Sequence, residues 1–272
     1  MSEINIGDYI EFFIESSQLD MPGKGDLEEA VHWAVEKAYG DAKRTMTGIG
    51  KFEDEKKNAL DDMRNEFKVF FTNGYQGAFK DMHEGLCKCW TSKFEREDAN
   101  LATYGKAQKI VNMTFKYMYC WCYWHCSEKE KWEENKDKKK FQSCHMTLDS
   151  YTLNWIYYRK KEKNEKPFNK DIKWSKLDSE NYETIEGFAG EEIEEVFGGM
   201  PPIEAEFLIW NYEMIREKTN EWVKAMEKYV KEDNHYPDEM VESLGKTKKA
   251  AEEVLDKFTL PPSSGKNRLS VS

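Results

Sequence analysis

Tyr104-Gly-Lys-Ala-Gln-Lys109-Ile-Val-Asn112-Met-Thr-Phe-Lys116-Tyr-Met-Tyr119 is the stretch of this chain that says most about its fold. The spacing predicts one helix that continues to about His125, with Lys109, Asn112 and Lys116 on a single stripe at i, i+3 and i+7. The adjoining stripe is apolar and is expected to face the core; it comprises Ile110, Met113, Tyr117, Trp121 and Trp124. The stretch therefore predicts amines beside an apolar wall.

Helical periodicity also dominates the rest of the chain. Further helices are expected at 27–38, 53–72, 79–90, 150–157, 184–196, 201–226 and 237–258. The charged segment 127–142 is expected to be a mobile surface excursion or a frayed helix end, and 160–179 a polar loop. There is no internal repeat and no β-type alternation. The predicted fold class is therefore all-α, with residues 1–259 as a single domain and 260–272 as a flexible tail.

Charge limits the kinds of partner that the chain can bind. The 272 residues carry a formal net charge of −11, which argues against indiscriminate binding of nucleic acid through bulk electrostatics. A local basic patch can still dominate a site, and three segments are net basic: 136–140, 159–163 and 170–176. These segments are either contacts for an acidic partner or solvated loops.

The sequence offers no sign of membrane insertion or secretion. It has no apolar run of 18 residues, and its first residues lack the basic and apolar regions of a signal peptide. Six cysteines in such a chain suggest reduced thiols, so we expect a cytoplasmic protein without a membrane partner.

Metal binding and several common enzyme classes find little support. Cys120, Cys122, His125 and Cys126 are of metal-ligand type, but Cys120 and Cys122 are two positions apart on a predicted helix and point to different sides. Buried free thiols are therefore favoured over a structural zinc. The chain also lacks G-x-S-x-G, a phosphate-cradling glycine loop and H-E-x-x-H, which leaves serine hydrolases, P-loop enzymes and zincins unsupported.

A lysine on the predicted helix and a carboxylate at the start of another remain as candidates for chemistry. Burial beside rings and a second cation such as Lys116 disfavour the charged form of the Lys109 amine, which favours nucleophilic attack. Asp149, at a helix N-terminus, would stay ionised and stabilise a cationic, sugar-like transition state. The alternative is structural: both lysines cover apolar surface with their stems, and Asp149 only caps a helix, at about 1 kcal/mol.

The segment Lys109-Ile-Val-Asn-Met-Thr-Phe-Lys116, followed by His145-Met-Thr-Leu-Asp149-Ser150, resembles the helix-hairpin-helix DNA glycosylases. It is most similar to the archaeal 8-oxoguanine DNA glycosylase branch, over roughly residues 101–158. The resemblance implies two lobes of helices with a base pocket between them. No cofactor or metal is expected. It also implies that Lys109 is the catalytic amine and Asp149 the catalytic carboxylate.

A glycosylase would flip a modified base out of DNA and excise it, with strand cleavage as a second activity. Pocket residues, or residues that modulate the protonation of the amine, would be Lys116, Asn112, His145, Tyr119, Tyr123, Trp124 and Trp210. Contacts to the DNA backbone would come from Lys106, Lys138, Lys139, Lys140, Arg159 and Lys160. Because some glycosylases of this kind act against phages with bulky modified bases, an antiphage role is included in the expectation.

The other function class left open is a non-catalytic helical binding protein in a phage defence or counter-defence system. The acidic composition of the chain favours it. The position of two atoms distinguishes the classes. The enzyme requires the amine of Lys109 and the carboxylate of Asp149 to line one cleft within several ångströms, whereas the binding protein does not.

Overall fold

The structure is a computed structural model that describes residues 5–74, 78–166 and 168–232, together with the single residues Glu242, Lys246 and Lys249. Over these residues the fold is all-α, as expected, and contains no strand. The α-helices are α1 (Ile6–Ser16), α2 (Leu27–Ala42), α3 (Glu53–Asn73), α4 (Phe79–Phe94), α5 (Tyr104–Trp124), α6 (Ser150–Glu162), α7 (Ser179–Phe197) and α8 (Pro202–Glu232). Short 3₁₀ helices are η1 (Lys43–Thr45), η2 (Ile49–Lys51), η3 (Lys129–Glu134), η4 (Lys138–Phe141) and η5 (Trp174–Lys176).

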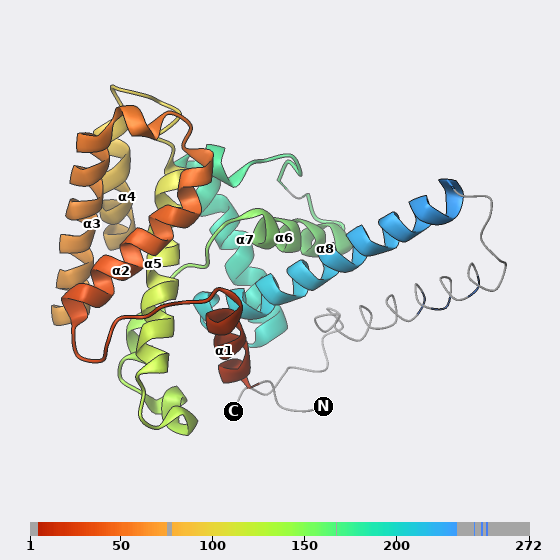
Figure 1. Cartoon of the computed structure of the whole chain (residues 1–272), viewed down its shortest axis with the longest axis horizontal. Helices are drawn as coiled ribbons and strands as arrows, with labels where there is room; N and C mark the ends of the chain where they lie inside the picture. Colours follow the sequence, from red (N-terminus) through yellow and green to blue (C-terminus); the bar gives the residue numbers. More distant parts are fainter. Residues whose placement is uncertain are drawn as a thin grey trace.

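Helix α5, which contains the stretch quoted above, runs through the middle of the molecule (Figure 1). Helices α2, α3 and α4 pack together on one side of it, and α6, α7 and α8 contact one another on the other side. Every residue from Gly105 to Cys120 is consequently buried, polar side chains included. Buried polar groups need partners, and α5 is the helix where those partners decide what the site can do.

Local sequence explains where several helices begin and end. The Asp26 carboxylate accepts a hydrogen bond from the backbone N–H of Glu29 and caps α2. Gly74 ends α3 and Gly198 ends α7, each with a positive φ that favours glycine. The expected helices at 27–38, 53–72 and 79–90 are therefore confirmed, and the structure extends the last of these to residue 94.

Three expectations need correction. Helix α1 was not predicted, and α7 begins at Ser179, five residues before the expected start, because Asp178 caps it by accepting from the N–H of Asn181. Segment 127–142 is not a surface excursion. It forms η3 and η4, and it buries Trp132 and Phe141. Two large rings at irregular spacing stabilise it, although its composition is mostly charged.

Two further predictions, the helix at 237–258 and the tail at 260–272, lie outside the residues that the structure describes. Within the described part of the chain, no helix combines the length and the apolar character that crossing a membrane requires.

Candidate functional site

A cleft of about 340 Å³ opens beside α5, between helices from both sides of the molecule. Its walls come from α1, α2, η1, α5, α6, η5 and α8. Six charged side chains line it: Asp41, Arg44, Lys109, Lys116, Asp149 and Glu206. Phe13, Met113, Tyr117, Tyr151, Trp174 and Trp210 supply its larger uncharged side chains. Because three acids face three bases, the cleft is close to neutral.

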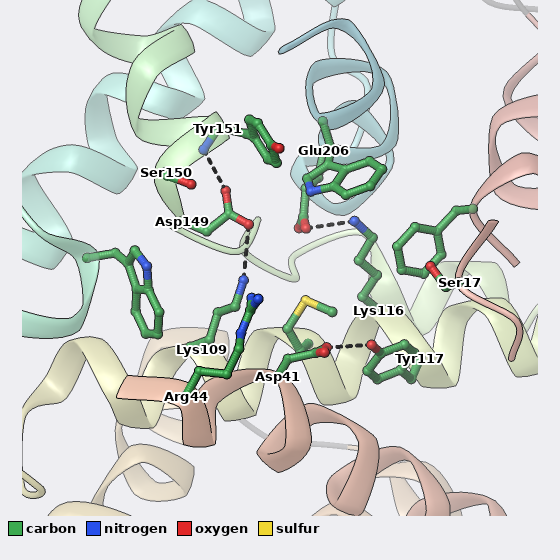
Figure 2. A pocket seen from close by; sticks show the side chains of 14 residues that line it. Ser17, Asp41, Arg44, Lys109, Lys116, Tyr117, Asp149, Ser150, Tyr151 and Glu206 are labelled. Atoms are coloured by element: carbon green, nitrogen blue, oxygen red, sulfur yellow. Dashed lines mark hydrogen bonds and ion pairs between the residues drawn. The ribbon is translucent and has the colours of Figure 1, made fainter. Parts of the chain in front are cut away.

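Lys109 and Asp149, the two predicted catalytic residues, meet in this cleft (Figure 2). Lys109 Nζ donates to Asp149 Oδ2 at 3.0 Å, and the side chains are only 9% and 13% exposed. The Lys109 amine also lies 5.5 Å from the centre of the Trp174 ring. The pair is therefore largely dry but remains open to the cleft on one side.

The geometry of Asp149 follows from its place as the N-cap of α6. Oδ1 accepts from the backbone N–H of Tyr151 at 3.0 Å and of Thr152 at 3.2 Å, while the N–H of Asp149 donates to Thr152 Oγ1 at 2.8 Å. This capping box turns the other oxygen, Oδ2, toward Lys109 (Figure 2). Burial alone would raise the pKa of the Asp149 carboxyl. The charge and hydrogen bond of Lys109, with the Thr152 N–H and the charge of Lys116, outweigh burial and hold this pKa below its ordinary value.

Lys116 lies deeper in the same cleft and has a different partner. Its Nζ donates to Glu206 Oε1 at 2.8 Å, with both side chains almost fully buried, and Glu206 Oε2 accepts from the backbone N–H of Thr147 at 2.7 Å. The amine sits over the rings of Phe13 at 4.4 Å and Phe207 at 4.6 Å. The lysine stripe thus forms two buried ion pairs side by side, one at the mouth of the cleft and one at its base.

Asn112, predicted on the same stripe, faces away from the cleft into a buried polar network. Its Oδ1 lies 2.9 Å from His83 Nε2, and its Nδ2 donates to the Tyr182 hydroxyl at 3.0 Å. His145 joins this network through the same hydroxyl at 2.9 Å from Nδ1. Asn112 and His145 are therefore not among the residues that line the cleft, because α5 is buried all round and its polar side chains are divided between two neighbourhoods.

The network holds two neutral imidazoles whose rings lie 4.8 Å apart. Burial, with His145 alongside, lowers the pKa of His83 to about 3, and burial lowers the pKa of His145 to about 4. In the unfolded chain both imidazoles titrate near 6.5. The unfolded state therefore binds more protons than the folded state between about pH 6.5 and pH 4.

The two buried histidines are accordingly expected to destabilise the folded chain as the pH falls. Two carboxyls act in the opposite direction, because burial raises the pKa of Glu213 to about 7 and raises that of Glu186 as well. As the pH falls below about 6.5, each buried histidine lowers the free energy of unfolding by on the order of 1.4 kcal/mol per pH unit. Urea unfolding at a series of pH values between 7 and 4.5 measures the net slope of all these groups, and the difference between wild type and a histidine variant isolates the histidine contribution. On acidification a His145→Gln variant should lose on the order of 1.4 kcal/mol per pH unit less unfolding free energy than wild type. The exposed His32→Gln variant should follow the wild-type slope. Parallel slopes for all three proteins would contradict the prediction.

Of the four predicted pocket rings, only Trp210 lines the cleft. Tyr119 is buried in the core, where its hydroxyl donates to Glu204 at 2.7 Å, and Tyr123 bonds to Glu11 at the far end of α5. Trp124 is 47% exposed and lies outside the cleft. A helix of 21 residues is about 30 Å long, so rings near its C-terminal end lie several turns from Lys109.

Four of the six predicted DNA-contacting cations are buried and occupied by internal partners. Lys106 donates to the carbonyl of Asn100, and Lys138 pairs with Glu204 at 3.0 Å. Arg159 pairs with Glu192 at 3.2 Å, and Lys160 with Glu191 at 2.6 Å. These four side chains are therefore not available for the phosphate contacts that the sequence analysis predicted. Lys139 is exposed and Lys140 half-buried, so these two remain accessible.

Sequence reasoning missed several residues that complete the cleft: Phe13, Asp41, Arg44, Trp174 and Glu206. Asp41 accepts a hydrogen bond from the Tyr117 hydroxyl, and Arg44 is exposed at the cleft (Figure 2). Only Trp174 carried a usable signal, because a large ring within a basic polar loop is unusual without something to pack on. The others come from helices whose periodicity gives no hint of a cleft.

Gly105 controls the position of Trp174. A Cβ at residue 105 would lie 1.8 Å from the Trp174 carbonyl oxygen, and the N–H of Gly105 donates to the Leu177 carbonyl at 2.8 Å. The first turn of α5 and the backbone around η5 are therefore in direct contact, which no residue larger than glycine permits.

Gly105→Ala is expected to lower the free energy of unfolding by roughly 1–3 kcal/mol, because the backbone of η5 must move to make room. Chemical denaturation measures the loss. Gly85→Ala in α4 is the matched control: its Cβ would meet nothing within 4 Å, and we expect no loss or a gain of roughly 0.5–1 kcal/mol. Equal stability of the two variants would show that the close contact between Gly105 and the backbone of η5 does not contribute to stability.

In comparisons with known proteins, no family model, no curated protein and no solved structure matches this chain. The geometry of the cleft is therefore what supports a functional proposal. Within the described residues, no group of three or more His, Cys, Asp or Glu side chains is placed to hold a metal ion, and all six cysteines are free thiols.

Proposed function

We propose that the chain is a DNA glycosylase that excises a modified base held in the cleft beside α5. The observation that carries the proposal is the 3.0 Å contact between Lys109 Nζ and Asp149 Oδ2 in a largely buried cleft. The archaeal 8-oxoguanine DNA glycosylase branch, which the sequence resembles most, uses a catalytic lysine and a catalytic aspartate. Forty positions separate these two residues in the chain, so neighbouring sequence alone does not account for their meeting.

The pair has complementary roles in base excision. As the bond between the base and the sugar C1′ breaks, the base departs with the bonding electrons and C1′ becomes cationic. Asp149, held ionised by its environment, stabilises that charge. Lys109 transfers a proton to the departing base, and its neutral nitrogen then forms a bond to C1′. The products are the free base and a cationic sugar–lysine adduct, so charge and atoms balance. The adduct can go on to eliminate the 3′ phosphate and cleave the strand.

The shape of the molecule supports a base pocket. Residues of α2 and α5 line one side of the cleft, and residues of α6 and α8 line the other. We propose that the helix groups to which they belong, α2 to α5 and α6 to α8 (Figure 1), are the two lobes. Its volume of about 340 Å³ is in the range of small-ligand sites. Trp174 and Trp210 line it and offer ring faces to a flipped base. Ring faces select little between bases, so bulky modified bases of phage DNA are included among the proposed substrates.

Borohydride trapping tests the proposal directly. The protein is incubated with phage DNA that carries modified bases and with 8-oxoguanine DNA, each as duplex and as single strand. Free base and protein–DNA adducts are measured with and without the reductant. Release of a base from at least one DNA supports a glycosylase, and a trapped adduct supports the lysine nucleophile. Absence of base release from every modified DNA would overturn the proposal.

A second candidate function is a non-catalytic binding protein, in a phage defence or counter-defence system. The observation that favours it is the internal pairing of Lys106, Lys138, Arg159 and Lys160, which leaves fewer cations for DNA phosphates. If the chain is a binding protein, the ion pairs Lys109–Asp149 and Lys116–Glu206 serve only to anchor α5 in the core. Stable binding of a protein or nucleic acid with no base release would support it.

A further inference from the structure

A second hollow of about 380 Å³ adjoins the cleft, along α6 and the loop that precedes α7. We call it the side pocket. Tyr157, Phe168 and Trp174 give it three rings, each only partly buried. The side pocket and the cleft share Ser150 and Trp174. A ligand can therefore extend from one to the other past a single tryptophan.

The rings of the side pocket are arranged to hold a flat group. The Tyr157 and Phe168 rings lie 6.1 Å apart at an angle of 71°, so they form a corner instead of filling the space with a closed stack. Asn154, on the same helix as Tyr157, lines the pocket and can both donate and accept hydrogen bonds. A nucleobase has the two features that this corner would recognise, an aromatic face and a polar edge.

The rim of the side pocket is cationic. Lys170 and Lys173 line it together with one acid, Asp171, and Lys170 Nζ lies 6.0 Å from the centre of the Tyr157 ring. The sequence segment 163–176, from which these lining residues come, contains five lysines and two acids in a chain whose net charge is −11. Amines placed beside ring faces suit a base that is attached to a phosphate.

We propose that the side pocket binds the nucleotide next to the one in the cleft, with its base in the corner of Tyr157 and Phe168 and its phosphate near Lys173. This inference rests on the proposed function for the identity of the ligand, but not on the excision chemistry. Two adjacent nucleotides cannot both leave the stack of an intact duplex cheaply, since unstacking costs a few kcal/mol per base. The substrate class is therefore single-stranded or locally unpaired DNA.

The test uses the Lys109→Gln chain, so that no DNA is consumed, and fluorescence anisotropy with unmodified labelled oligonucleotides. Single strands are expected to bind more tightly than duplexes of the same length. Phe168→Ala should weaken single-strand binding by about 5- to 150-fold, the equivalent of one lost stacking contact. Lys173→Gln should reduce the salt dependence of log K by about 0.7. Phe12→Ala, an exposed phenylalanine on α1, and Lys57→Gln, an exposed lysine on α3, should change neither quantity.

A second readout locates the base. 2-Aminopurine at one position of the single strand should lose fluorescence on binding, and the loss should be smaller with Phe168→Ala. Equal affinity for duplex and single strand, or a Phe168→Ala variant that binds as its parent does, would overturn the inference. Lys173→Gln changes only an exposed side chain, so its salt dependence remains interpretable if Phe168→Ala is unstable.

The two proposals can fail separately. Base release by the wild-type chain, together with unchanged binding by Phe168→Ala, would retain the glycosylase and remove the side pocket. Weakened binding by Phe168→Ala, with no base release from any DNA, would retain the side pocket and remove the glycosylase. Tight binding of the mononucleotide alone, with no gain from a longer strand, would assign the pocket to free nucleotides and overturn the proposed strand contact.

Discussion

Replacing Lys109 with glutamine is expected to abolish the trapped adduct and to slow base release by roughly 10³-fold or more, because the variant loses both the nucleophile and the proton donor. Glutamine is uncharged and can still donate a hydrogen bond to the Asp149 carboxylate, so the start of α6 should remain in place. The measurement is single-turnover base release from a DNA on which the wild-type chain is active, with borohydride trapping in parallel. Lys57→Gln makes the same chemical change at an exposed position of α3 and should leave both readings at the wild-type level.

Asp149→Asn separates two versions of the mechanism. It removes the charge that faces C1′ while asparagine can still cap α6. If base release survives Lys109→Gln and is lost only in Asp149→Asn, the carboxylate works with water and the lysine is not the nucleophile. If both variants release base at the wild-type rate, the pair on α5 and α6 has no part in catalysis and the proposed site is wrong.

Lys116→Met is expected to cost about 3–5 kcal/mol of unfolding free energy, the largest stability loss that we predict for a single substitution. The Lys116 and Glu206 side chains are 1% and 2% exposed, so removal of the amine leaves a buried carboxylate without its counter-charge. Methionine fills a similar volume, which keeps the effect of an empty cavity small. Urea unfolding at pH 7 gives the loss directly. A loss below about 1 kcal/mol would mean that water reaches the carboxylate and that the pair is not dry.

The matched control is the double variant Lys116→Met with Glu206→Leu. Replacing both charges by apolar groups removes the stranded carboxylate, so the double variant should recover most of the stability that Lys116→Met loses. It should not recover all of it, since the backbone N–H of Thr147 loses its acceptor as well. Additive losses from the two single variants would show that the two side chains do not interact.

The sequence was a good guide to the helices and a partial guide to the site. Helix α5 could be predicted because its apolar side chains repeat at helical spacing, and α2 because Asp26 is a strong N-cap. Helix α1 was missed although its sequence carries a signal: Asn5 caps it, and Ile6, Ile10, Phe13 and Ile14 repeat at helical spacing. Its place against α8 could not be predicted from the segment itself. Segment 127–142 was misjudged because two buried rings outweigh many exposed charges, and no local pattern reports that balance.

For the site, spacing and resemblance identified Lys109 and Asp149, and the structure places them in contact. Burial of Lys160 could not be foreseen, because only one of its two close partners, Glu165, is nearby in the sequence, whereas Glu191 is 31 positions away on α7. A run of lysines in sequence looks basic whether or not acids from a distant helix neutralise it. Glu206 was missed for the same reason, since only the packing of α8 brings it to Lys116.

Asp149 has two roles: it caps α6, and it accepts a hydrogen bond from Lys109. A related chain without the proposed activity would still be selected to retain Asp149, because the cap alone contributes about 1 kcal/mol to folding. Lys109 does not cap a helix, so it has no comparable structural role. Among sequences related to this one, retention of the aspartate would therefore be weak evidence for activity. Loss of Lys109, by contrast, would indicate a related chain that retains the fold but lacks the proposed base-excision activity.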